Sequence, residues 1–284
     1  MNIIVVGIGL IGGSICKALK KNTEHHVIGL DRDTQSLNMA VATEAIDEVI
    51  YEDQPELLNK GDLVVVCIPP KATVDFVLRN KDYFKKGAIV TDVCGVKRYI
   101  VNAVEEPLRE IGVEFIGAHP MAGTEFSGFL YSKDNLFVNA SYLLTPTSMT
   151  DRGKLEILRN FGKELGFRTV LETTPENHDA SIAYTSQLAH VVSNSYIKSP
   201  TLAKEKGFSF GSFQDMTRVA RLDEDMWCDL FLLNKDNLLF EVDTLIAHIN
   251  EHREALIAGD RERIRMMLRK GRLLKEANAD IRKS

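Results

Sequence analysis

The sequence predicts an α/β fold in which a doubly wound parallel sheet is followed by an all-helical domain. Two patterns predict it: strand-like apolar runs alternate with helical segments early in the chain, and the strand-like runs stop after about Thr174. Alternating β and α segments imply a parallel sheet with helices on both faces. We therefore expect a sheet domain over residues 1–173 and a helical domain over residues 174–284.

The predicted strands are short apolar runs, several of them rich in valine. The run 62–68 (DLVVVCI) is continuous, as expected for a strand buried on both faces of a parallel sheet, and two prolines end it. The other predicted strands span residues 3–6, 27–30, 88–92, 114–118, 141–145 and 167–171. The last two flank a helix rich in Leu and Ile and should extend the same sheet.

One predicted helix of the second domain carries a single apolar stripe. The residues of the stripe recur at helical spacing: Leu238, Val242, Leu245, Ile246 and Ile249. A helical domain of this size with such stripes often buries its surplus apolar face against a copy of itself. We therefore expect a homodimer formed through this domain.

The composition argues against several classes of protein. Of 284 residues, 44% are hydrophobic and 26% charged, which is typical of a globular, cytoplasmic protein. The net charge is -5 and the basic residues are scattered, which argues against nucleic acid or a membrane surface as partner. No stretch approaches the roughly 20 apolar residues of a membrane span. The four cysteines contain no C-x-x-C pair, so we expect neither a metal site nor disulfides.

A glycine turn follows the first predicted strand and opens the first predicted helix. Residues 7–12 (GIGLIG) fit G-x-G-x-x-G in the context that gives this pattern meaning. Gly7 permits a tight turn, Gly9 lets a pyrophosphate approach the backbone, and Gly12 allows close packing of helix on strand. Free N–H groups at the helix start, including Leu10 and Ile11, would hold the phosphates. The turn predicts a Rossmann-type dinucleotide site.

Asp31 ends the second predicted strand, 24 residues after Gly7. A carboxylate there can accept both ribose hydroxyls of NAD and would repel the 2′-phosphate of NADP. Arg32 beside it can pair with that phosphate, which leaves NADP open. We expect NAD as the cofactor.

Polar segments follow three strands at the edge where an open α/β sheet binds ligands. Pro69 and Pro70 follow one strand and should line the cofactor pocket, while DVCGVK (92–97) follows the next. His119 opens the third segment. An imidazole there can accept a proton from a substrate hydroxyl as hydride leaves to a nicotinamide. The alternative is a histidine that only bonds the backbone of its turn.

The helical part supplies a second set of polar residues. His178, Asp179 and His190 fall in one or two helices, and the two histidines would lie about 120° apart around one straight helix, so we do not expect them to act together. Further on, Arg218 follows a glycine-containing polar loop and is suited to clamping a carboxylate. Alternatively, Asp215 is a helix N-cap and Arg218 a surface ion-pair partner.

These motifs together resemble the prephenate and arogenate dehydrogenase family over nearly the whole chain. The matching segments are the glycine turn, D-V-x-x-V-K at 92–97, HPMAGTE at 119–125, S-x-L-x-H at 186–190, F-x-D-x-T-R-x-A at 213–220 and M-W at 226–227. Their order and spacing make the combination specific. The resemblance implies oxidative decarboxylation of prephenate to 4-hydroxyphenylpyruvate, with hydride transfer to NAD, in tyrosine biosynthesis.

The resemblance also implies roles for single residues. His119 would be the catalytic base. A substrate pocket would be formed by His190, Gln214, Asp215, Arg218 and Trp227. Arogenate carries an ammonium where prephenate has a ketone, and the neutral Gln214 favours prephenate. An arogenate dehydrogenase that forms tyrosine directly remains the alternative.

Gly95 departs from the family pattern. Many members have serine there (D-V-G-S-V-K), and that serine is expected to support the catalytic histidine and the nicotinamide. Gly95 would still line the cofactor site, so the orientation of His119 would fall to Thr124, Ser127 or a water. In the segment S-H-L-P-H, common in the family, this chain has Gln187 in place of the first histidine.

Two other classes of protein share parts of this pattern. Dehydrogenases of the β-hydroxyacid type share the two-domain plan but rely on a helical catalytic lysine, for which no convincing context exists in this chain. A non-catalytic dinucleotide sensor with a helical partner-binding domain would need neither His119 nor Arg218.

Overall fold

The computed structural model describes residues 1–124 and 126–281. It divides into two compact units, Met1–Asn234 and Lys235–Ser284. The first unit holds a sheet with the strands β1 (Asn2–Val6), β2 (His26–Leu30), β3 (Glu48–Ile50), β4 (Leu63–Val66), β5 (Ile89–Asp92), β6 (Glu114–Pro120), β7 (Ser141–Thr145) and β8 (Thr169–Glu172).

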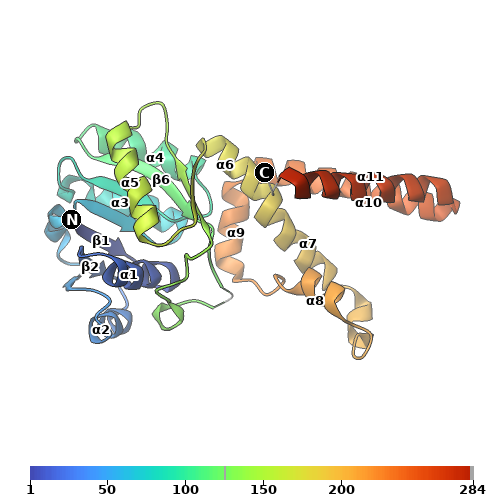
Figure 1. Cartoon of the computed structure of the whole chain (residues 1–284), viewed down its shortest axis with the longest axis horizontal. Helices are drawn as coiled ribbons and strands as arrows, with labels where there is room; N and C mark the ends of the chain where they lie inside the picture. Colours follow the sequence, from blue (N-terminus) through green and yellow to red (C-terminus); the bar gives the residue numbers. More distant parts are fainter. Residues whose placement is uncertain (125, 282–284) are drawn as a thin grey trace. The chain divides into compact units, whose positions relative to one another are not determined.

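The helices complete the two units (Figure 1). In the first unit they are α1 (Leu10–Asn22), α2 (Thr34–Ala42), α3 (Pro70–Asn80), α4 (Arg98–Arg109), α5 (Arg152–Glu164), α6 (Pro175–Ile182), α7 (Leu188–Tyr196), α8 (Gly211–Thr217) and α9 (Glu224–Leu233). In the second unit they are α10 (Lys235–Ala258) and α11 (Arg261–Ile281). In the part of the chain that is described, no helix has the length and apolar character to cross a bilayer.

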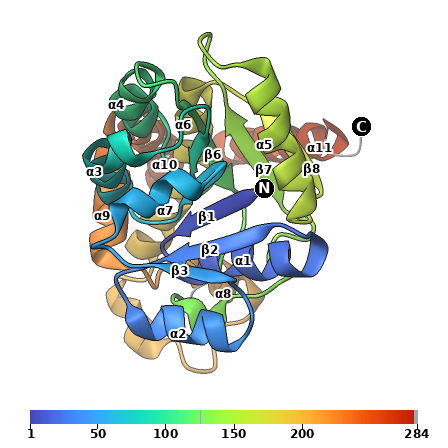
Figure 2. The ribbon, with the colours of Figure 1, turned by 90° about the vertical axis from the view of Figure 1, so that its left-hand side faces the viewer.

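The sheet separates two apolar cores. Its order is β3-β2-β1-β4-β5-β6-β7-β8, and the first six strands are all parallel. Ile3 and Val5 of β1 pack in the core with α1, α2 and α5, whereas Ile4 and Val6 pack with α3 and α4. Figure 2 shows these helices on opposite sides of the strands. Alternate residues of one strand thus face two helix layers, which confirms the predicted doubly wound sheet.

The structure differs from the sequence-based strands in two places. β3 was not predicted, because its three residues (EVI) make no recognisable run. β7 joins the sheet as expected but runs antiparallel to β6, with His119 opposite Leu143. The apolar pattern of residues 141–145 predicts a strand but carries no information on its direction.

The glycine turn has the predicted geometry. Gly7 has a φ of +88°, a conformation that side chains rarely adopt, and its N–H donates to the Leu30 carbonyl oxygen. A Cβ at Gly12 would overlap the carbonyl oxygen of Gly7, so only glycine lets α1 begin so close to the turn. A Cβ at Gly9 would meet nothing within 4 Å, and this position faces open space.

After β8 the first unit is helical, as predicted. α6 continues into α7 through a five-residue π-helical turn, Ala183–Gln187. Such a turn amounts to one residue inserted into an α-helix, and it changes the direction in which the residues of α7 point relative to those of α6. His178 of α6 and His190 of α7 lie on either side of it.

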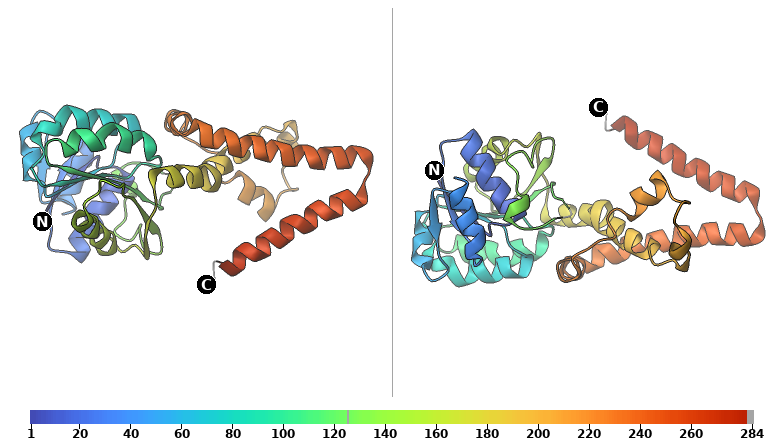
Figure 3. Two further views of the ribbon diagram at one scale, coloured as in Figure 1. Left: turned by 90° about the horizontal axis from the view of Figure 1, so that it is seen from above. Right: turned by 90° about the horizontal axis from the view of Figure 1, so that it is seen from below.

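The second unit is a helical hairpin. Gly259 turns the chain with a φ of +61°, and the Asp260 carboxylate caps α11 by accepting the Arg263 N–H at 2.9 Å. Arg263 also bonds Glu254 of α10 at 2.9 Å. Figure 3 shows α10 and α11 diverging from this turn.

The predicted stripe of α10 is only partly buried, with Val242 and Leu245 half-buried. Leu238 is buried, but Ile246 and Ile249 are 49% and 56% exposed. The division of the chain at residues 173 and 174 stays a prediction.

Gly12→Ala should destabilise the fold strongly. The added methyl group would clash with backbone rather than with a flexible side chain, so we expect the free energy of unfolding to fall by about 3 kcal/mol or more. Gly9→Ala is the matched control, since its methyl group points into open space, and should cost less than about 1 kcal/mol. Denaturant unfolding of both variants measures the difference. Equal stabilities would contradict the close packing at Gly12.

Candidate active site

The ends of β5 and β6 are joined by a buried ion pair. Lys97 and Asp92 are both fully buried, and the Lys97 ammonium bonds the Asp92 carboxylate. The regular ladder between the strands ends at the pair of Thr91 with Ile116. Beyond it, the Ala118 N–H donates to Asp92 Oδ1 at 3.2 Å, and the Ala118 carbonyl oxygen accepts from Lys97 Nζ at 2.6 Å. The ion pair thereby fixes the backbone immediately before His119.

The half-buried His119 contacts a second histidine from another element. Its Nδ1 lies 2.9 Å from Nε2 of His178 on α6, and the two rings meet edge to face. On its other side, Nδ1 of His178 lies 2.8 Å from Oδ1 of Asp179. A row of Asp179, His178 and His119 therefore leads from the buried middle of α6 to the end of β6.

Asp179 is anchored at the start of α4. Its two carboxylate oxygens accept the backbone N–H groups of Lys97 at 2.7 Å and of Arg98 at 3.0 Å. These are free donors at the positive end of a helix, where a carboxylate is favoured. The Asn234 amide also donates to the Asp179 carbonyl oxygen at 2.8 Å. The segment Asp92–Arg98 thus holds β6 through side chains and α6 through backbone.

Electrostatics keep both histidines neutral. Burial holds the pKa of His119 well below its usual range, and the nearby His178 and Lys97 act in the same direction. Burial also lowers the pKa of His178, against the opposing influence of Asp179. For Asp179, burial acts to raise the pKa, but the hydrogen bonds from His178, Lys97 and Arg98 outweigh it and the pKa is lowered. The row therefore consists of a carboxylate and two neutral imidazoles.

Gly95 lies beside the other edge of the His119 ring. A Cβ at Gly95 would lie 3.9 Å from His119 Cε1 and Nε2 and 3.6 Å from Leu230 Cδ2, which is ordinary contact. The Nε2 edge of His119 therefore faces a position that presents no side chain, and α9 borders it.

Thr124, Ser127 or a water was expected to orient His119, and the group found at its Nδ1 edge is His178. Thr124 was one expected partner, but its hydroxyl bonds within its own turn, donating to the Phe126 carbonyl oxygen and accepting the Phe126 N–H. Instead, the Nδ1 edge of His119 is held by His178. Glu125 of the HPMAGTE segment lies outside the described residues.

A second group of predicted residues gathers around α9. The rings of His190 and Trp227 have centroids 3.7 Å apart, tilted by 31°. Nδ1 of His190 lies 2.9 Å from the Ser186 carbonyl oxygen, so this nitrogen carries the proton in the neutral ring. Burial lowers the pKa of His190, and the nearby Arg218 guanidinium adds to the effect. Leu230, one turn after Trp227, approaches Gly95, so α9 borders both groups.

Three of the predicted substrate residues lie on α8 or directly after it. Gln214, Asp215 and Arg218 are all solvent-accessible. Asp215 lies inside α8, whose N-cap is Phe210, so the alternative in which Asp215 caps the helix is wrong. Among the described contacts, none links Gln214 or Asp215 through its side chain to His119.

The predicted cofactor residues line the start of α1 and the neighbouring strand ends. Asp31 bonds the turn itself, because its carboxylate accepts the Ile8 N–H at 2.5 Å and the Asp33 N–H at 2.8 Å. Leu10 and Ile11 are half-buried in the first turn of α1, and Pro69 is exposed just before α3. Open space over Gly9 leaves room for a ligand's phosphates at this helix start. Within residues 1–124 and 126–281, no three histidine, cysteine or acidic side chains form a cluster suited to a metal ion.

The sequence did not reveal the role of His178 and Asp179 at this site. Their partners lie 59 and about 80 residues away in the chain. The sequence singled them out only as polar residues of a predicted helix, without partners. The buried Lys97 was recognised as part of a motif, but its pairing with Asp92 required the structure.

Known proteins resemble this chain over most of its length. Two family models match it: prephenate dehydrogenase, nucleotide-binding domain, over residues 15–171, and prephenate dehydrogenase, dimerization domain, over residues 174–270. The prephenate dehydrogenase of Bacillus subtilis is 32% identical over 274 residues, which cover 92% of this chain and 72% of that protein.

Two solved structures are similar over their whole length. Prephenate dehydrogenase from A. aeolicus in complex with hydroxyphenyl propionate and NAD+ has a TM-score of 0.87 at 30% identity, over 99% of this chain and 98% of that one. Synechocystis arogenate dehydrogenase has a TM-score of 0.80 at 30% identity, over 100% of this chain and 99% of that one.

Proposed function

The chain belongs to the prephenate dehydrogenase family, and we propose that it oxidises and decarboxylates prephenate to 4-hydroxyphenylpyruvate with NAD as hydride acceptor. One observation carries the proposal beyond the resemblance. A neutral histidine, His119, stands at the cofactor edge of the sheet with Nδ1 bonded and Nε2 directed at the space beside Gly95. That arrangement suits a general base.

The glycine turn suits a dinucleotide. The room over Gly9 and the free N–H groups of Leu10 and Ile11 match the needs of a pyrophosphate. Each oxygen of Asp31 keeps a lone pair after bonding Ile8 and Asp33, so the carboxylate can still accept ribose hydroxyls. When bound, NAD supplies the site that accepts the hydride.

In the proposed reaction, His119 accepts a proton from the substrate hydroxyl and later returns it. As hydride leaves the ring carbon that bears the hydroxyl, the O–H bond breaks and its proton moves to Nε2. The bond from the ring to its carboxylate then breaks, CO₂ departs, and the electron pair completes the aromatic ring. The imidazolium returns its proton to the phenolate oxygen. The balance is prephenate and NAD+ to 4-hydroxyphenylpyruvate, CO₂ and NADH.

We assign substrate binding to the group on α7, α8 and α9. The exposed Arg218 guanidinium would pair with a substrate carboxylate. Arg218 lies near enough to His190 to lower the pKa of that ring, and His190 contacts Trp227. Gln214 carries no charge that would attract the ammonium of arogenate, which favours prephenate. The similarity to an arogenate dehydrogenase keeps arogenate as the second candidate.

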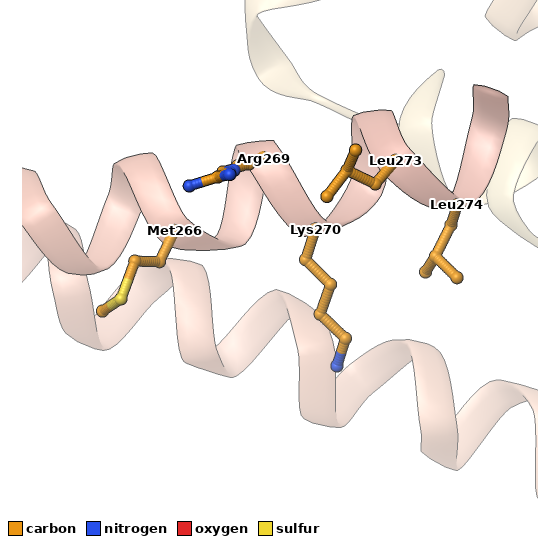
Figure 4. A pocket seen from close by; sticks show the side chains of 5 residues that line it. All are labelled: Met266, Arg269, Lys270, Leu273 and Leu274. Atoms are coloured by element: carbon orange, nitrogen blue, oxygen red, sulfur yellow. The ribbon is translucent and has the colours of Figure 1, made fainter. Parts of the chain in front are cut away.

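The helical part would also form the dimer. Many apolar side chains on α10 and α11 are exposed: Leu239, Phe240, Ile246, Ile249, Leu256, Ile257, Met266, Leu268, Leu273 and Leu274. On α11, three of them line a shallow pocket with Arg269 and Lys270 (Figure 4). Apolar surface of this extent marks an interaction site. The match to a dimerization-domain model supports a second copy of the chain as the partner.

Two further proposals concern the chain as a whole. The boundary between cofactor and substrate domains would lie at residues 173 and 174, since β8 ends at Glu172 and the family models meet there. The four cysteines are free, which agrees with a reducing compartment such as the cytoplasm.

The proposed reaction is tested by following NADH absorbance with prephenate and, separately, arogenate as substrate. We expect prephenate to be turned over faster, with one CO₂ released per NADH.

His119→Asn should lower kcat by about 10²- to 10⁴-fold while NAD+ still binds. Because the pKa of His119 is depressed, its base form persists below pH 6.5, so wild-type kcat/KM should fall only below that pH. Near wild-type turnover by His119→Asn would remove His119 as the base.

Arg218→Ala should weaken substrate binding. Loss of a charge-assisted hydrogen bond of about 1.5–3 kcal/mol corresponds to a rise in KM for prephenate of roughly 10- to 100-fold. Arg221→Ala, an exposed arginine three residues further on, is the matched control and should leave KM unchanged. An unchanged KM in Arg218→Ala would refute the carboxylate clamp.

Light scattering should give the wild type twice the chain mass of 31.8 kDa. Ile249→Glu places a charge in the proposed interface, where burying it without a partner is unfavourable, and should shift the protein towards monomer. Asn250→Glu, about 100° around the same helix, is the control and should stay dimeric. A dimeric Ile249→Glu protein would place the interface elsewhere.

A further inference from the structure

We propose that His178, held by Asp179, is a positioning residue: it selects the tautomer of His119 in which Nε2 is free to take the substrate proton. The proposal rests on the function proposed above, but its central statement concerns the protein without substrate. Its basis is the order of hydrogen bonds along the row from Asp179 to His119.

The protons of the row follow from its chemistry. An ionised carboxylate can only accept hydrogen bonds, so Nδ1 of His178 must donate to Asp179 across 2.8 Å. A neutral imidazole has one N–H, which leaves Nε2 of His178 as an acceptor. At 2.9 Å from it, Nδ1 of His119 must then be the donor. His119 therefore carries its proton on Nδ1 and its lone pair on Nε2.

The row is rigid enough to enforce this order. His178 is 1% exposed and Asp179 is fully buried. Asp179 cannot turn away, because its carboxylate also accepts the backbone N–H groups of Lys97 and Arg98. Asn234 holds the backbone of the same residue. The reversed order would require a protonated Asp179 facing these two donors, which its depressed pKa disfavours.

No other described group competes for this task. Gly95 has no side chain to bond Nε2, and the Thr124 hydroxyl is engaged within its own turn. Without His178, both nitrogens of His119 could carry the proton. In the fraction with the proton on Nε2, the lone pair would point away from the space beside Gly95, and the ring could not act as a base there.

His178 would also stabilise the charged form of His119. Once the substrate proton has bonded to Nε2, the imidazolium donates from Nδ1 to His178 more strongly than the neutral ring does. The negative charge of Asp179 lies behind His178 and compensates the new positive charge. No proton moves along the row, and its hydrogen bonds keep their direction, as in other carboxylate-oriented histidines.

The first test needs no variant and no substrate. Selective ¹⁵N labelling of histidine distinguishes a protonated from an unprotonated ring nitrogen by its chemical shift, and the His119 signals are identified as those missing from His119→Asn. We expect His119 with a protonated Nδ1 and an unprotonated Nε2 at neutral pH. A proton on Nε2 would overturn the proposal, whether or not the protein turns over prephenate.

The second test compares two substitutions of one residue. His178→Leu removes the acceptor and should lower kcat by about 10- to 1,000-fold, less than the roughly 10⁴-fold effect of a wholly wrong tautomer. The KM for prephenate and the Kd for NAD+ should change little, because His178 is 1% exposed and lies behind His119. His178→Gln can still offer an oxygen acceptor and should recover part of kcat together with the Nδ1-protonated tautomer.

His25→Leu is the matched control, since His25 also bonds a carboxylate, Glu164 at 3.2 Å, but lies between α1 and β2. It should keep the wild-type kcat and tautomer. Wild-type kcat in His178→Leu would refute the proposal while leaving the proposed reaction intact. If His178→Leu does not fold, the wild-type spectrum and His178→Gln still decide. Absence of prephenate turnover in the wild type would refute the reaction but not the tautomer.

Discussion

The geometry of the site depends on the buried ion pair between Asp92 and Lys97. Two charges without solvent contact cost several kcal/mol each to desolvate, so the pair is tolerable only if its hydrogen bonds are complete. They are completed by the backbone of Ala118, beyond the last ladder pair of β5 and β6. On the β5 side these bonds replace the ladder, while on the other side β7 still pairs with β6 up to Pro120. The backbone leading into His119 is therefore held from both sides. The same segment anchors Asp179 through its backbone N–H groups.

The charges around this ion pair determine the protonation state of His119. The positive charge of Lys97 near the half-buried His119 ring disfavours protonation of His119. Once the substrate proton has moved to His119, the carboxylate of Asp179 behind His178 would compensate the new positive charge. The proposed base is therefore neutral at rest and would be stabilised when charged. The proposed substrate-binding group around Trp227 has the opposite environment, since Gln214, Asp215 and Arg218 are exposed and could meet an anionic ligand before it is desolvated.

Local patterns predicted the parts of the fold that local forces determine. The glycine turn, the valine-rich strands and the helical second half were recognised because each depends on neighbours within a few residues. β3 was not predicted because three residues are too few to form a recognisable apolar pattern. The direction of β7 was not predicted because an apolar strand pattern is the same in a parallel and an antiparallel strand. His119, His190 and Arg218 were found through motifs. The pairing of His119 with His178 could not be predicted from motifs, because it depends on how α6 packs against α4. No short segment of sequence encodes that packing.

The π-helical turn Ala183–Gln187 has a consequence for comparing relatives by alignment. Each residue advances an α-helix by about 100°, so loss of one residue here would restore a continuous helix and rotate His190 by that angle relative to His178. The motif S-x-L-x-H would be unchanged in sequence, but its histidine would point in another direction. Within such a family, a gap of one position ahead of this motif carries more information about the substrate pocket than a substitution inside it.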